Sequence, residues 1–354
     1  MAKIKLSTYP YTYVRVVAMR SKLLSKDDYH KLVRMKLGEI ARYLQESEYK
    51  REIDELGIKF SGAFLLELAI HRNLIRNFQK LRRISNVSSN ELLLLIDNYL
   101  VRSDIWNIKT VLRAKFTGIS EAELLNIILP IGKLSEEHLI SLFRKDSVEE
   151  IIKSVDFIKF KAIKPALDYF REKKSFLEIE NFLDKYYYSQ IIAFAQKIPK
   201  EGELFREFLM NEIFIQNTIT VLRMKRSNIK PEDIRNFIIM TGERSFDRPI
   251  EKLLRSENFE EMISGLEKSK FGNYIKEGLR MYKEKMTLVY LEADFMKYLL
   301  KRSALLLHQN PLSASVILGY MMAKEIEVKN IGTIIKGKEL GLSDEFVENS
   351  LVIA

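Results

Sequence analysis

The sequence contains no cysteine, and that absence excludes several classes of protein. A disulfide scaffold, a zinc–thiolate site, an iron–sulfur cluster and a thiol nucleophile all require cysteine. Histidine is almost as scarce, with four residues spread over 354, which argues against a histidine-rich metal centre. We therefore predict that the chain holds no metal and no cofactor.

Glycine and proline are also few, at 14 and 7 residues. A β-rich chain of this length would need more turn residues. No run alternates apolar and polar residues, and the Asn-Gly and Asp-Gly hairpin signals are absent. Apolar residues instead recur at three- and four-residue steps. We predict an all-α fold, with long helices over 63–82, 205–224 and 311–340.

Long apolar runs are lacking as well. The first residues have no apolar stretch of the kind that a secretory signal needs. The longest uncharged stretch runs from Ser303 to Ala323, and its middle, His308–Pro311, is polar and stops a helix. We therefore expect no membrane-spanning segment.

The formal net charge is +10, from 58 Lys and Arg against 48 Asp and Glu. A surplus of this size is compatible with nucleic acid, an anionic membrane surface or an acidic partner. Lysine and glutamate are interspersed throughout, which favours a mixed, solvated surface. A basic helical protein that binds nucleic acid, or a scaffold protein, stays open as the alternative function.

The chain carries an internal repeat. Three segments, Asn107–Lys115, Asn217–Lys225 and Asn330–Lys338, start 110 and 113 residues apart. Each reads Asn, two variable residues, Thr, two aliphatic residues, a base, a small or flexible residue, and Lys. Two further anchors, which begin at Leu44 and at Leu32 in the first copy, recur in the same order.

A period near 110 residues is too long for helical solenoid units of roughly 34 to 47 residues. It corresponds to a whole small helical domain. We predict three such domains, 1–119, 120–230 and 231–354, with helix breaks near Gly118–Ser120 and Asn228–Pro231. Three copies that offer one another the same face can close around a pseudo-threefold axis.

Motifs that would carry chemistry have structural explanations. The spacing of Gly332–Lys338 matches a phosphate-binding loop, but Glu339 follows it in place of Ser or Thr, and it lies inside a predicted helix. His138 has no second histidine at metalloprotease spacing. We predict that His71 packs or caps a helix, and that Trp106 packs in the core or between domains. No catalytic residues emerge, so we predict that the chain is not an enzyme.

The segments Tyr11–Leu24, Leu44–Tyr49 and Gly319–Ile331 resemble a known family. It comprises the C subunit of archaeal A-type ATP synthases and the d subunit of V-type ATPases, and the likeness runs from about residue 9 to about residue 352. The resemblance implies a funnel-shaped, non-catalytic rotor component that couples the D and F subunits of the central stalk to the membrane proteolipid ring. It also implies a peripheral protein on the cytoplasmic face of the cell membrane, in a machine that couples ion flow to ATP synthesis.

The resemblance supplies no short set of contact residues, so we predict the partner-binding residues from the repeat. They are the two bases that close each repeated segment: Arg113, Lys115, Arg223, Lys225, Lys336 and Lys338. Equivalent positions in three copies would face a common axis or rim. The alternative is that these bases finish their helices and complement the helix dipole.

Overall fold

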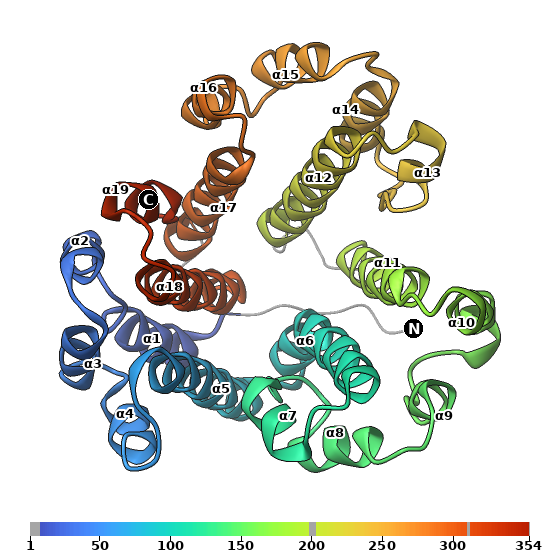
Figure 1. Cartoon of the computed structure of the whole chain (residues 1–354). Helices are drawn as coiled ribbons and strands as arrows, with labels where there is room; N and C mark the ends of the chain where they lie inside the picture. Colours follow the sequence, from blue (N-terminus) through green and yellow to red (C-terminus); the bar gives the residue numbers. More distant parts are fainter. Residues whose placement is uncertain (1–7, 198–202, 310–311, 354) are drawn as a thin grey trace. The chain divides into compact units, whose positions relative to one another are not determined.

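The computed structural model describes residues 8–197, 203–309 and 312–353. All regular secondary structure in these ranges is helical, which confirms the all-α prediction (Figure 1). The chain divides into two compact units. One runs from Ile75 to Phe194, and the other combines the chain up to Leu74 with the chain from Ala195 onward.

The unit from Ile75 to Phe194 is built on one long helix, α6. Its helices after α5 are α6 (Asn90–Thr117), α7 (Glu121–Ile127), α8 (Glu136–Phe143), α9 (Val148–Lys153), α10 (Phe160–Lys173) and α11 (Leu177–Ala195). The three helices α7, α8 and α9 pack on α6. Gly118 ends α6 with φ of +71°, a left-handed conformation that glycine adopts without strain, and Ser120 caps α7. The predicted break between Gly118 and Ser120 is confirmed.

The other unit contains residues from both ends of the chain. Its first part holds α1 (Pro10–Arg20), α2 (Lys26–Arg34), α3 (Leu37–Gln45), α4 (Lys50–Leu56) and the start of α5 (Gly62–Ser88). Its second part holds α12 (Glu203–Arg226), α13 (Pro231–Arg235), α14 (Arg244–Arg255), α15 (Phe259–Glu267), α16 (Lys276–Lys285), α17 (Val289–Gln309), α18 (Ser315–Glu339) and α19 (Asp344–Ser350). In this unit α17 packs on α18 and on α12, while α1 and α2 also pack on α18 (Figure 1). The last long helix is therefore covered by residues from the start of the chain.

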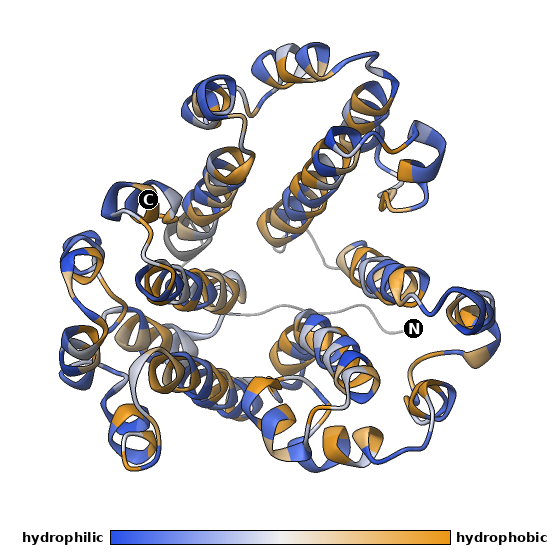
Figure 2. Ribbon diagram, viewed as in Figure 1, coloured by the Kyte–Doolittle hydropathy of each residue, from blue (hydrophilic) through white to orange (hydrophobic). Residues whose placement is uncertain are grey.

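The predicted apolar faces are buried. Helix α5 contains the predicted segment 63–82, and its face is closed to solvent at Leu66, Ile70, Leu74, Phe78 and Leu81. Helix α12 contains the predicted segment 205–224 and buries Phe208, Ile215 and Leu222, while Ile219 is partly buried. Figure 2 shows hydrophobic and hydrophilic residues interspersed along the helices. Helix α12 buries residues on more than one side, because α14 and α17 both pack on it. The third predicted helix begins at Ser315, and residues 310 and 311 lie outside the described residues.

Trp106 does not lie in the core, so that part of its prediction is wrong. Its side chain is 43% exposed. The buried face of α6 passes through Ile105, Ile108 and Leu112, and this leaves Trp106 on the solvent side of the same turn.

None of the helices in the described ranges combines the length and the apolar character that crossing a bilayer demands.

Candidate functional site

The asparagine that opens each repeated segment is a buried clamp. Each one donates from Nδ2 to a backbone carbonyl and accepts at Oδ1 from the N–H of the same residue, with distances of 2.7 to 2.9 Å. The partner lies 22 positions downstream in every copy, in the pairs Asn107 with Leu129, Asn217 with Ile239, and Asn330 with Val352. Both ends of each amide are thus satisfied in the core. The clamp holds the chain that follows each long helix against that helix, so the asparagine has a structural role.

Two of these clamps join residues on opposite sides of the predicted domain limits at 119/120 and 230/231. The division into three domains, and the pseudo-threefold axis, stay predictions.

The first base of each repeated segment forms an ion pair with a glutamate. The pairs are Arg113 with Glu180, Arg223 with Glu292, and Lys336 with Glu67. Both arginines bind bidentately, with N–O distances of 2.5 to 2.7 Å. Lys336 lies 3.0 Å from Glu67 and 2.7 Å from Glu339. Each pair joins a long helix to a second helix of the same unit.

The three glutamates recur at spacings of 113 and 112 residues. They form a further anchor of the repeat, which the sequence comparison missed. In the first two pairs the glutamate follows its base, but Glu67 precedes Lys336 by most of the chain. The spacing from base to glutamate is therefore similar in the first two pairs, at 67 and 69 residues, and does not occur in the third. The third pair fits the repeat only if the first copy is counted as following the last.

These three bases stay accessible to solvent. Arg113, Arg223 and Lys336 expose 61%, 63% and 56% of their side-chain surface. The hydrogen bond with Glu180 raises the pKa of Arg113, and bonds with Glu339 and Glu67 raise the pKa of Lys336. Both residues are therefore cations at physiological pH. An exposed ion pair adds little stability, so such a base can share its charge with a further carboxylate.

The second base of each segment contacts the following part of the chain, differently in each copy. Lys115 lies over the Phe143 ring, Lys225 donates to the Ser256 carbonyl, and Lys338 pairs with Asp344. The three distances are 5.7, 2.5 and 2.6 Å in that order. The structure thus gives all six predicted bases contacts within the chain, and their role toward a partner stays a prediction.

The segment with phosphate-loop spacing lies inside α18. A Cβ atom at Gly337 would stand 2.4 Å from the side chain of Val347, so the glycine allows α19 to pack closely on α18. A strand followed by a loop, which a phosphate site of this kind requires, does not precede the segment in the described part of α17 and α18. Close packing between α18 and α19 therefore explains why glycine stands at position 337.

His71 is half-buried on α5, as predicted for a packed histidine. Burial lowers the pKa of His71, and the nearby charge of Glu67 offsets part of that change. The neutral imidazole is therefore favoured in the folded chain. Among the residues that the structure describes, no three His, Asp or Glu side chains are grouped to hold a metal ion.

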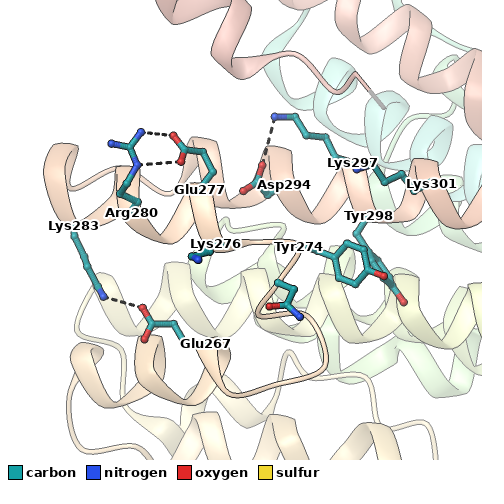
Figure 3. A pocket seen from close by; sticks show the side chains of 11 residues that line it. Glu267, Tyr274, Lys276, Glu277, Arg280, Lys283, Asp294, Lys297, Tyr298 and Lys301 are labelled. Carbon is teal, nitrogen blue, oxygen red and sulfur yellow. Dashed lines mark hydrogen bonds and ion pairs between the residues drawn. The ribbon is translucent and has the colours of Figure 1, made fainter.

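A charged cavity of about 610 Å³ lies beside α16 and α17. Figure 3 shows that most of its charges are paired, as Arg280 with Glu277, Lys283 with Glu267, and Lys297 with Asp294. Asp294 also accepts a 2.7 Å hydrogen bond from the N–H of Gly278, which fixes α16 against α17. These contacts brace α16 against α17 and against the end of α15.

Known proteins match the chain from end to end. The family model described as ATP synthase (C/AC39) subunit matches residues 12–350. The chain is 36% identical to the C subunit of the A-type ATP synthase of Methanosarcina mazei over 349 residues, which cover 98% of this chain and 93% of that protein. It is 36% identical to the corresponding C subunit of Methanococcoides burtonii over 354 residues, covering 98% and 95%. Identity to the C subunit of Halorubrum lacusprofundi is 30% over the full length of both chains.

Proposed function

Because the chain belongs to the ATP synthase C/AC39 subunit family, and is therefore a subunit of an A-type ATP synthase complex, we propose that it is a non-catalytic coupling body. It connects the central stalk, through the D and F subunits, to the proteolipid ring in the membrane. It sits as a peripheral protein on the cytoplasmic face of the cell membrane. Through it, ion transport by the ring drives ATP synthesis, or ATP hydrolysis drives the ring.

The threefold recurrence of one packing device carries this proposal. Each long helix that bears a repeated segment has the same asparagine clamp and the same base–glutamate pair. A body that transmits torque must resist bending, and each clamp removes freedom from the chain that leaves a long helix. Three similar parts also present three similar surfaces to a rotating axle.

We propose Arg113, Arg223 and Lys336 as contacts for acidic groups of the stalk or ring. Each base is exposed and is held in place by its own glutamate. A partner carboxylate that shares the base gains a charge-assisted hydrogen bond without moving the backbone. The second bases, Lys115, Lys225 and Lys338, contact the segments that follow their own helices, and we assign them a secondary role toward these partners.

The test is co-expression of the tagged chain with the D and F subunits, followed by size-exclusion chromatography with mass determination. We expect a 1:1:1 complex. The variant Arg113→Glu/Arg223→Glu should weaken that complex, or binding to the isolated ring, at least about tenfold, because two charge pairs become repulsive. A chain that ignores both the stalk pair and the ring would overturn the proposal.

A matched control separates partner contact from internal packing. The charge swap Arg113→Glu/Glu180→Arg keeps the internal ion pair but moves the positive charge onto α11. If the base itself meets the partner, this variant should bind as weakly as Arg113→Glu. Full binding by the swapped variant would show that only the internal pair matters.

A further inference from the structure

Helix α14 carries a row of bases on one side. They follow one another at steps of four, four and three residues: Arg244, Arg248, Lys252 and Arg255. Such steps bring side chains to one face of a helix. The opposite face buries Ile250 and Leu254 in the core of the unit. We refer to the four bases as the α14 stripe.

The α14 stripe lines a cavity of about 1070 Å³ between α14 and α15. Two more bases, Lys268 and Lys270, line it from the far side. Glu261 is the one acidic residue among the described residues that line this cavity, and its Oε2 already accepts a 2.8 Å hydrogen bond from the N–H of Glu257. Six bases against one acid make this concave surface strongly positive.

The bases of this cavity have few acidic neighbours: Glu251, on the same helix, lies three residues after Arg248 and four before Arg255, and it does not line the cavity. No base of the α14 stripe, nor Lys268, forms an ion pair within the described residues. Asp247, on the same helix, accepts hydrogen bonds from the backbone of Thr241 and Gly242 at 2.9 Å and serves as a cap there. Clustered like charges repel one another and lower the stability of a fold, unless an external anion binds among them.

Lys270 also lines the cavity. Its Nζ donates to Oδ1 of Asn211 at 3.0 Å and lies 4.3 Å from the centre of the Phe246 ring. Desolvation lowers the pKa of Lys270, although the residue as a whole stays exposed, and the charge of Glu207 offsets part of that change. Its position adds a partly desolvated cation to the exposed stripe.

The geometry favours a polypeptide over nucleic acid as the occupant. The aromatic residues of the lining, Phe214 and Phe271, stack on each other at 4.7 Å inside the core and are not offered to nucleobases. The stripe extends over the 12 residues of α14, and its first and last bases are about 16 Å apart at about 1.5 Å per step. Carboxylates at three- and four-residue steps on a second helix have the same spacing as the stripe.

We propose that the cavity between α14 and α15 receives an acidic helical segment of another polypeptide, whose carboxylates pair with the α14 stripe. The three arginines suit this role because a guanidinium binds a carboxylate through two parallel hydrogen bonds. None of the repeated bases lines this cavity, although Lys225 bonds to the carbonyl of Ser256, which does. The inference does not depend on the contacts proposed above for the stalk and the ring.

The test uses the full chain and two labelled synthetic helical peptides. One carries four glutamates at the steps of the α14 stripe, and the other has the same composition with the glutamates spread around the helix. In fluorescence anisotropy the matched peptide should bind at least about fivefold more tightly, and its affinity should fall as salt is added. The variant Arg248→Glu/Lys252→Glu should lose at least about tenfold in affinity for it.

The control variant Lys161→Glu/Lys164→Glu changes two exposed lysines of α10 and alters net charge by the same amount. Its affinity should match that of the wild type, and thermal unfolding should show that both variants are folded. Equal loss of affinity in both variants, or equal binding of both peptides, would reduce the effect to general charge attraction and overturn the proposal.

The proposal would also be overturned if another anionic ligand bound more tightly than the matched peptide, in a manner that depends on Arg248 and Lys252. The ligands to compare are a single-stranded oligonucleotide and vesicles with anionic lipid. The complex with the D and F subunits should form in every one of these variants, so failure here is distinct from failure of the proposed coupling function.

Discussion

Helices α12 and α18 hold their neighbours at the same repeat position with opposite chemistry. Phe214 stands three residues before the clamp asparagine of α12, and Glu327 stands three residues before that of α18. In α12, Phe214 stacks on Phe271 with ring centres 4.7 Å apart and planes 12° from parallel. In α18, Glu327 accepts a 2.6 Å hydrogen bond from the hydroxyl of Tyr49, which holds the place of Phe271 in the repeat.

The polar version is a closed network with its charges paired. Lys324 lies 2.6 Å from Glu327 and 3.0 Å from the Tyr49 hydroxyl, and the two charged side chains are 1% and 2% exposed. The other carboxylate oxygen of Glu327 accepts from the N–H of Leu24 at 2.6 Å. Burial, together with the charge of Glu327, raises the pKa of Tyr49 far above its ordinary value, so its hydroxyl stays a donor.

The two kinds of contact differ in how far apart in the sequence their partners lie. Phe271 lies 57 positions after Phe214, whereas Tyr49 lies 278 positions before Glu327. Many apolar surfaces can cover a phenylalanine, but a buried charge is stable only beside a partner with matching groups. We therefore expect that the aromatic stack supplies stability, and that the charged network selects which segment of the chain covers α18.

The largest effect is expected from Lys324→Ala. This change leaves the carboxylate of Glu327 buried without its cation, and should lower the free energy of unfolding by about 3–5 kcal/mol in denaturant titrations. The variant Lys324→Met/Glu327→Leu/Tyr49→Phe replaces the charged network by apolar side chains and should recover most of that loss, apart from the hydrogen bond that the N–H of Leu24 loses. If the triple variant is as unstable as the single one, the unpaired charge is not the source of the loss.

Removal of a clamp should come next. Asn217→Ala leaves the N–H and carbonyl of Ile239 buried without partners, at a cost of about 2–4 kcal/mol. Asn330→Ala should cost about the same, because the clamp is identical in α12 and α18. Thr220→Ala, which removes an exposed hydroxyl bonded within α12, is the matched control and should change stability little. Unequal costs for the two asparagines would mean that the helices differ in more than the network.

Much of this comparison could be predicted from the sequence, because local periodicity determines where helices form. The repeat located the three asparagines, and the helical period placed the apolar faces of α5 and α12. The partners of those asparagines were not predictable, because the residues 22 positions downstream share only apolar character. The internal partners of the repeated bases were not predictable either, because Glu180 and Glu292 lie 67 and 69 positions from Arg113 and Arg223, and no helical period links residues so far apart.

A smaller loss is expected from Phe214→Leu. Leucine keeps most of the buried apolar volume but loses the stacking on Phe271, so unfolding should become easier by about 1–1.5 kcal/mol. The change Phe271→Tyr introduces the residue found at this repeat position beside α18. Its hydroxyl finds no Lys–Glu pair in α12, so this variant should lose more unfolding free energy than Phe214→Leu. If Phe271→Tyr proves neutral, the apolar character of this position in α12 is not required.

The smallest effect should appear on acidification. His71 stands four residues after Glu67 on the helix that pairs with α18, while Met296 stands four residues after Glu292 on the helix that pairs with α12. Because burial lowers the pKa of His71 below its ordinary 6.5, the unfolded chain takes up a proton first as the pH falls. The free energy of unfolding should therefore decrease as the pH falls from 6.5 toward the lowered pKa, and this part of the decrease should disappear in His71→Met. Hydrogen exchange measured at pH 7 and again below pH 6.5 can locate this effect in the structure. The exchange of amide protons should become faster in α5 and α18, while α12 and α17 serve as the unchanged control. Equal acceleration in both pairs of helices would show that the pH response does not arise at His71.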